Sequence, residues 1–222
     1  MENNKNENAV KRYIREYHVM TNSIYRLITN IIIPLLAVLP SVISIIVNRT
    51  YALQIVVTVM IYMVFMFCEL MGDYFCFGCI CRKNGFGMEF LKTGYNGVNY
   101  FEHAVLVDIL IRPVRAGITI LIAAMPFIML GVSIWSVFDI IVITAIISVA
   151  ALNVTRYIGM GQYVMLVAYL FMIPAFAGGF AVVMYGERFK FIAPLLAVLL
   201  VAVIAATYYH MSARIRRSYI DC

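Results

Sequence analysis

The chain has 222 residues, of which 64% are hydrophobic and only 13% are charged. A soluble fold of this length could not bury so much apolar surface and still present a polar exterior, so the composition excludes a soluble enzyme and a disordered regulator. In so apolar a chain the net charge of +6 favours lysine and arginine beside anionic lipid over nucleic-acid binding. We therefore expect an integral membrane protein that contacts the lipid bilayer and no nucleic acid.

Six apolar stretches are candidates for crossing a bilayer, which requires about 20 mostly apolar residues. They lie at residues 27–47, 52–70, 114–130, 135–155, 163–184 and 191–209. Only Gly131, Val132 and Ser133 separate the third stretch from the fourth, and the third is short, so a re-entrant hairpin fits this pair as well as two full spans do. The sequence predicts an all-α protein with six transmembrane helices, in a single domain over residues 1–222.

The basic residues predict the orientation of these spans. With the amino terminus inside the cell, 14 of the 17 Lys and Arg residues lie in the cytoplasm, and Arg49, Arg188 and Lys190 lie outside. Such an excess of positive charge in the cytoplasmic segments is typical of membrane proteins. We expect a multi-pass protein of the cell membrane with both termini in the cytoplasm.

The first 26 residues form a polar and basic segment. Val10, Ile14 and Tyr17 recur at helical spacing on one side, whereas Lys11 and Arg15 take the other. A basic amphipathic helix that leads directly into a span is typical of a helix in the membrane surface. The alternative is a frayed polar tail.

The cytoplasmic loop at residues 71–113 is long enough to fold outside the membrane. Residues 88–92 predict a short helix, and Asn96-Gly97 predicts a turn, because both residue types tolerate left-handed backbone angles. A second helix is predicted from Val98, and Pro113 marks the beginning of the third span. We expect a helix-turn-helix loop that projects into the cytoplasm.

This order of elements is informative as a whole: an amphipathic helix, two spans, a helical cytoplasmic loop, and four spans with very short outer loops. In this order the chain resembles the membrane subunit of an ABC exporter of the type-2 permease class, and GMEFLKTGYNG at residues 87–97 resembles the coupling segment of that family. The resemblance implies a permease that works as a homodimer or with a second permease subunit. The chain has no G-x-x-x-x-G-K-[ST] motif for binding ATP. ATPase activity is therefore expected from a separate ABC ATPase subunit, and none from this chain.

The resemblance places the contact with the ATPase at residues 88–96, where Glu89, Phe90, Lys92 and Tyr95 are expected to touch that partner. An apolar anchor with charges around it is common in protein contact surfaces. The alternative is that this short helix lies against the membrane, with Phe90 in lipid. Because the spans carry few polar groups, we expect a hydrophobic or amphipathic substrate, such as a peptide or a lipid.

Glu69 and Asp73 form a candidate acidic pair near the inner end of the second span. They are four residues apart and therefore share one face of a helix. Acidic groups within a membrane face protein or water rather than lipid. Two interpretations remain open: the pair coordinates a transported cation, or it forms salt bridges with Arg82, Arg112 or Arg115 that fix the depth of the helix.

Cys76, Cys79 and Cys81 have a spacing that is compatible with a soft metal ion. A structural zinc site requires four ligands, and the sequence offers no second Cys or His pair, so we expect no metal and no cofactor. A cysteine protease would need His103 beside Cys79 or Cys81, but the chain lacks the close His-to-Cys order of peptide-processing proteases. A peptide-processing protease or an immunity factor is the alternative to a permease.

The predicted topology can be tested with reporter fusions along the chain. Fusions after residue 26, within residues 82–96 and at the carboxyl terminus should report a cytoplasmic location, because these segments are basic. Fusions near Arg49 and Arg188 should report the outside. A carboxyl terminus outside the cell would contradict the prediction.

Overall fold

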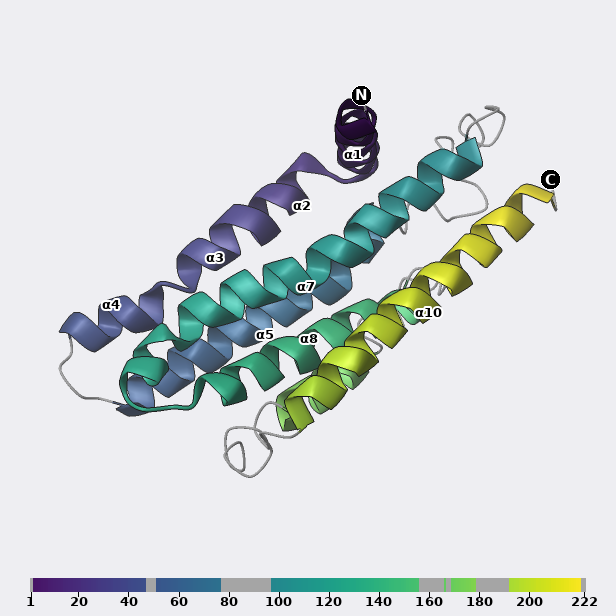
Figure 1. Ribbon diagram of the computed structural model, residues 1–222. Coiled ribbons are helices and arrows are strands. Elements are labelled where there is room, and N and C mark those ends of the chain that lie inside the picture. The colour runs from purple at the N-terminus through teal and green to yellow at the C-terminus, as the bar shows by residue number, and fades with distance from the viewer. Residues whose placement is uncertain are drawn as a thin grey trace.

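The computed structural model describes residues 2–46, 51–76, 97–155, 166, 169–178 and 192–220. Nearly all of these residues are helical, and no strand occurs among them, which confirms the all-α prediction. The long helices lie side by side in an elongated bundle, whereas α1 (Glu2–Met20) lies across one end of it and is seen along its axis in Figure 1. The amino terminus, the beginning of α7 and the carboxyl terminus lie at this same end.

Three helical segments are long and apolar enough to cross a membrane, namely Ser23–Ile46, Ile134–Asn153 and Ile192–Arg217. They coincide with the first, fourth and sixth predicted spans. Shorter apolar helical stretches, Ile55–Leu70 and Tyr169–Gly178, fall within the second and fifth predicted spans. Large apolar side chains such as Ile45 and Val198 are exposed on the outside of the bundle, as expected of helices that lipid surrounds.

The first apolar segment consists of several short helical pieces rather than one regular α-helix. It consists of α2 (Ser23–Leu27), the π-helical turn η1 (Ile28–Ile32), α3 (Ile33–Leu36) and α4 (Leu39–Ile46). The Asn22 side chain accepts a hydrogen bond from the Ile24 amide at 2.9 Å and so begins α2. Pro34 and Pro40 cannot donate backbone hydrogen bonds, and the two turn residues between α3 and α4 lie between them.

The second and third long helices are α5 (Tyr51–Cys76) and α7 (Gly97–Met129). We expected a helix from Val98 and a third span that begins at Pro113. In the structure both belong to α7, a single helix of 33 residues that contains both Pro113 and Pro126. A helix that packs along its length against neighbouring helices tolerates such prolines, since the neighbours compensate for the lost hydrogen bonds.

A short turn joins α7 to α8 (Ile134–Thr155). Gly131 has a φ of 96°, a backbone angle that residues with a side chain rarely adopt. The Ser133 hydroxyl accepts a hydrogen bond from the Trp135 amide at 3.3 Å and so supports the first turn of α8. Consequently α7 and α8 form an antiparallel pair (Figure 1).

The last helix, α10 (Ile192–Ile220), runs parallel to α8 (Figure 1). Asn153 near the end of α8 donates a hydrogen bond to Thr207 at 2.9 Å and contacts His210 at 3.0 Å. Both partners lie in the second half of α10. The two helices therefore share a direction along the bundle.

The apolar core lies where α8 meets its neighbours. The largest cluster combines residues from the first apolar segment, α5, α7, α8 and the helical stretch Tyr169–Gly178: Ile33, Phe65, Met66, Leu70, Ala116, Ile120, Val137, Ala151 and Ala175. In the middle of the bundle Tyr62 Oη lies 3.0 Å from Thr144 Oγ1 and donates to the Ala175 carbonyl at 3.5 Å. These polar contacts fix the relative positions of α5, α8 and the stretch that contains Ala175.

The amino-terminal helix packs against α7. Tyr17 and Met20 are buried with Phe101 and Ala104 of α7. Glu16 Oε2 lies 2.9 Å from His103 Nδ1, whose ring also stacks on Tyr13 with 3.9 Å between ring centroids. The expected amphipathic helix is thus present, and one of its sides faces protein.

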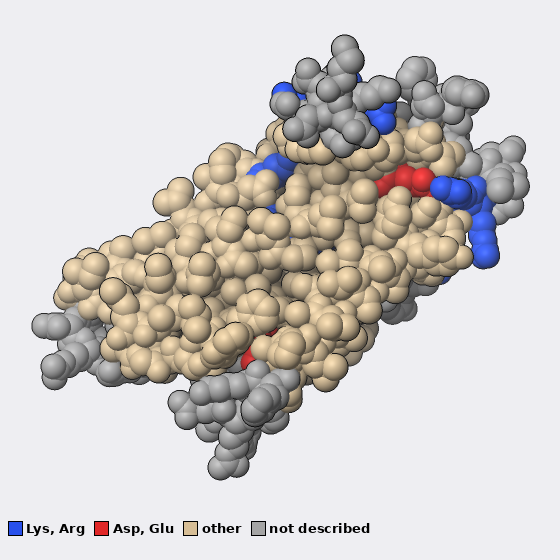
Figure 2. All heavy atoms as spheres, in the orientation of Figure 1, with Lys and Arg blue, Asp and Glu red and all other residues tan. Residues whose placement is uncertain are grey.

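Exposed basic side chains gather at the end of the bundle that carries both termini. We call this the basic end, and its exposed residues are Lys11, Arg12 and Arg15 of α1 and Arg214, Arg216 and Arg217 of α10. Figure 2 shows most of the visible Lys and Arg side chains at this end, whereas the long flank of the bundle is almost free of visible charge.

Glu102 of α7 connects α7 to α10 at the basic end. Its carboxylate accepts hydrogen bonds from Arg216 Nε at 2.7 Å and Arg216 Nη2 at 3.2 Å, and a further one from the Ser212 hydroxyl. The hydrogen bonds from Arg216 hold the pKa of Glu102 below its ordinary value. A lowered pKa means that the contact contributes stability above the ordinary pKa and loses it as the pH falls through the folded-state pKa.

We therefore expect the amides of residues 212–217 to lose protection from hydrogen exchange when the pH falls below about 4. Glu102→Gln should show reduced protection of these amides already at pH 7, because the neutral amide cannot replace the ion pair. Hydrogen exchange followed by mass spectrometry and expressed as protection factors measures both effects. Glu16→Gln, which affects the α1 contact, is the matched control and should leave residues 212–217 protected. Equal protection in wild type and Glu102→Gln at pH 7 would show that the contact does not hold α10.

Candidate functional site

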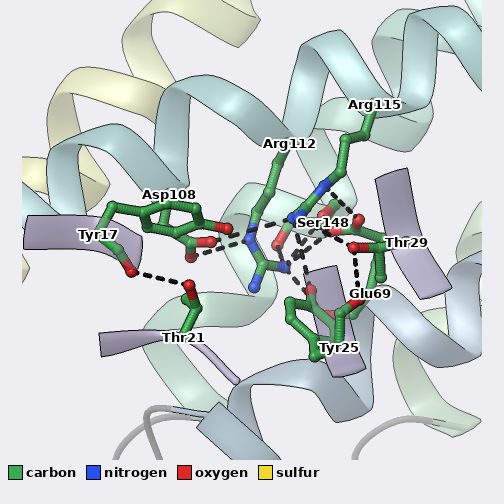
Figure 3. Close-up of polar contacts among 9 residues, drawn as sticks. All are labelled: Tyr17, Thr21, Tyr25, Thr29, Glu69, Asp108, Arg112, Arg115 and Ser148. Carbon is green, nitrogen blue, oxygen red and sulfur yellow. Dashed lines mark hydrogen bonds and ion pairs between the residues drawn. The ribbon is translucent and has the colours of Figure 1, made fainter. Parts of the chain in front are cut away.

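The most unusual feature of the bundle is a group of four buried charges, Glu69, Asp108, Arg112 and Arg115, which we call the ionic cluster (Figure 3). Each of these residues is at most 4% exposed. Two carboxylates and two guanidinium groups give a formal charge of zero. Buried charges are rare unless they are paired, and in a membrane protein they indicate a functional site by default.

The sequence of α7 brings three of the four charges together. Asp108, Arg112 and Arg115 are spaced by four and three residues, so they project from one face of the helix. Arg112 Nε donates to Asp108 Oδ2 at 3.2 Å, an i, i+4 pair within α7. The fourth charge, Glu69, reaches the cluster from α5.

Glu69 and Arg115 form the closest ion pair of the cluster. Arg115 Nε lies 2.8 Å from Glu69 Oε1, and Arg115 Nη2 donates a hydrogen bond to Oε2 at 3.1 Å. The Nε contact is ionic without an aligned hydrogen bond. Both carboxylate oxygens therefore lie beside the same guanidinium group, with one hydrogen bond between the two side chains.

Arg112 joins three helices. Its Nη1 lies 3.4 Å from Glu69 Oε2 and donates to the Glu69 backbone carbonyl at 3.1 Å, which connects α7 to α5. The same nitrogen donates to Ser148 Oγ at 3.2 Å, which adds α8. Ser148 Oγ in turn donates to Glu69 Oε2 at 3.4 Å. A single side chain of α7 thus contacts both α5 and α8.

Arg115 extends the cluster to the first apolar segment. Its Nη1 donates to Thr29 Oγ1 at 3.4 Å and its Nη2 donates to Tyr25 Oη at 3.5 Å. The guanidinium carbon also lies 5.6 Å from the centroid of the Tyr25 ring, within the range of a cation–π interaction. Thr29 belongs to the π-helical turn η1, and turns of this kind occur often at functional sites.

The amino-terminal helix covers the cluster from the basic end. Tyr17 is 1% exposed, and Figure 3 shows its hydroxyl directed toward Asp108. Burial and the nearby Asp108 carboxylate raise the pKa of Tyr17 above its ordinary value. The cluster is consequently shielded by α1 and contacted by the first apolar segment, α5, α7 and α8.

The structure describes only some of the residues that sequence analysis selected. Glu69 lies in the cluster and contacts two of the three arginines considered for it, Arg112 and Arg115. Asp73 lies in α5, but its side chain is outside the described part of the chain. The docking residues Glu89, Phe90, Lys92 and Tyr95, together with Cys79 and Cys81, are also outside the described residues. Cys76 is the last residue of α5.

Four members of the site were not selected from the sequence: Tyr25, Thr29, Asp108 and Ser148. Asp108 had a usable signal, because it precedes Arg112 by one helical turn in an otherwise apolar stretch. Thr29 and Ser148 had no such signal in the sequence. Ser and Thr are common in membrane helices, and only tertiary packing brings these two residues into the site. Among the described residues, no group of three or more His, Cys, Asp or Glu side chains could hold a metal ion.

Comparisons with known proteins give no family assignment: no family model matches the chain, and no curated protein or solved structure is significantly similar to it.

We expect Glu69→Gln to destabilise the protein by about 3–5 kcal/mol, because it leaves two buried arginines with a single carboxylate. The double variant Glu69→Gln/Arg115→Gln restores a neutral cluster and should be less destabilised than the sum of the two single variants. Thermal unfolding of the purified protein in detergent measures the differences. The control is Glu102→Gln, whose partner Arg216 is 65% exposed and whose loss should matter much less. If Glu69→Gln behaves like the control, the cluster is not a closely coupled unit.

Proposed function

We propose that the chain is the permease subunit of an ATP-driven exporter, working with a separate ABC ATPase and with a second copy of itself or a similar permease. The observation that carries this proposal is the continuity of α7. This helix begins at Gly97, immediately after the expected docking segment at residues 88–96, and extends through Arg112 and Arg115 to Met129. A movement imposed at residues 88–96 would therefore reach the buried charges through one continuous helix.

The ionic cluster is the point at which such a movement would change the bundle. Arg112 and Arg115 both belong to α7, and their partners Glu69, Ser148 and Thr29 belong to three other segments. A shift of α7 along its axis would separate these pairs together, because all of them depend on the same helix. We propose that the cluster holds the cytoplasmic half of the bundle closed and that its separation opens this half.

The order of the helices supports six crossings with both termini in the cytoplasm. The first apolar segment runs away from the basic end, α5 returns, α7 runs away again and α8 returns (Figure 1). Because α8 and α10 are parallel, the chain must return between them, and the helical stretch Tyr169–Gly178 lies at the level of Tyr62 and Thr144 on that route. We assign the basic end to the cytoplasm, in agreement with the predominance of positive charge inside.

An amphipathic or hydrophobic substrate agrees with the chemistry of the bundle. Several clusters of the described interior are apolar, as in the group of Ala37, Ile61 and Ala123.

The test is co-purification after joint expression of this chain with candidate ABC ATPases of the source organism. Glu89→Lys/Phe90→Ala should abolish co-purification and leave membrane insertion intact, since it reverses a charge and removes the apolar anchor of the docking segment. The matched control, Glu187→Lys/Phe189→Ala, makes the same chemical changes in the predicted outer loop and should retain the ATPase. If the docking variant still holds its ATPase and still transports, the docking segment is wrongly assigned. If wild type never binds an ABC ATPase, the proposed function is wrong.

A further inference from the structure

The amino-terminal helix α1 has three distinct sides. One side faces α7 and carries the buried residues Glu16, Tyr17 and Met20. The second side is apolar and exposed, since Val10 is 56% and Ile14 is 40% accessible. The third side carries Lys11 and Arg15, which are both exposed. Packing against α7 therefore leaves an exposed surface on α1 that combines apolar and basic side chains.

The position of α1 places this surface at the edge of the bilayer. Only Thr21 and Asn22 separate the end of α1 from the apolar segment Ser23–Ile46, which is long enough to cross a membrane. In Figure 1 α1 also lies across the long helices, so it extends along the membrane plane if those helices cross the membrane. A helix with this position has acyl chains on one side and lipid headgroups beside it.

We propose that α1 binds anionic phospholipid headgroups through the surface formed by Val10, Lys11, Ile14 and Arg15, which we call the α1 outer surface. Val10 and Ile14 supply the apolar contact with the acyl chains. Lys11 and Arg15 supply positive charge at the level of the phosphates, and Arg15 adds a planar group that can bind a phosphate with two nitrogens. Charge complementarity selects an anionic lipid over a zwitterionic one.

Lipid bound at this surface would act on the ionic cluster through α1. Glu16 pairs with His103 of α7 at 2.9 Å, and Tyr17 is directed toward Asp108 (Figure 3). A lipid that holds α1 in the membrane surface therefore also holds Tyr17 over the cluster. This inference does not depend on transport, because it concerns the position of α1 alone.

The test uses the full chain in vesicles and tryptophan fluorescence. The sequence contains one tryptophan, Trp135, which lies next to the turn at the opposite end of the bundle. In Trp135→Phe/Val10→Trp the only fluorescent tryptophan would report on the α1 outer surface. We expect brominated phosphatidylglycerol to quench it more strongly than brominated phosphatidylcholine in vesicles of equal lipid composition. The preference should amount to about fivefold in lipid occupancy for each basic side chain.

Three double variants, each made in the Trp135→Phe/Val10→Trp background, decide whether the basic side chains of α1 select the anionic lipid. Lys11→Gln/Arg15→Gln should abolish the preference for the anionic lipid, whereas the charge-conserving Lys11→Arg/Arg15→Lys should retain it. Arg214→Gln/Arg217→Gln removes the same charge from α10 at the same end of the bundle and should also retain it. The proposal is overturned if neither lipid quenches, if both quench equally, or if the α10 variant loses the preference as the α1 variant does.

Discussion

The pairing of Glu69 with two arginines is the interaction on which the arrangement of this bundle depends. Its carboxylate faces Arg115 at 2.8 Å and Arg112 at 3.4 Å, and none of the three residues is more than 4% exposed. An isolated charge in such an environment would be very unfavourable. The helices that carry these residues must therefore pack with one particular register, since another register would leave a buried charge without its partner.

Such a cluster contributes specificity more than net stability. Replacing a buried ion pair by well-packed apolar residues is often neutral or stabilising, whereas removing one partner is strongly destabilising. Apolar packing is less directional than ion pairing, and the core combines large side chains such as Phe65 with small ones such as Ala116 and Ala151. The ion pairs of Arg112 and Arg115 define one position among many. A position defined in this way can be released by the movement of a single helix.

The sequence predicted the helical class, the first, fourth and sixth apolar helices, and an amphipathic helix before the first span, because these depend on composition and on local periodicity. One of the two interpretations that it left open for Glu69, pairing with Arg112 or Arg115, matches the contacts of that side chain. The sequence did not predict that α7 continues through Pro113, because the effect of an internal proline depends on the helices packed around it. It missed Thr29 and Ser148 for a related reason: a hydroxyl residue becomes part of a site only through side chains that lie far away in the sequence. Positions 88–96 stay a prediction.

The distribution of the cluster along the chain has a consequence for biogenesis. Glu69 is synthesised 43 residues before Arg112 and 46 before Arg115, so α5 leaves the ribosome with an acidic residue whose neutralising partners do not yet exist. If α5 and α7 cross the bilayer as proposed, neither can reach its final depth alone without an unpaired charge in the lipid. The two helices are then expected to enter the bilayer together. The turn at Gly131, which lets α8 and its Ser148 follow directly, would complete this assembly.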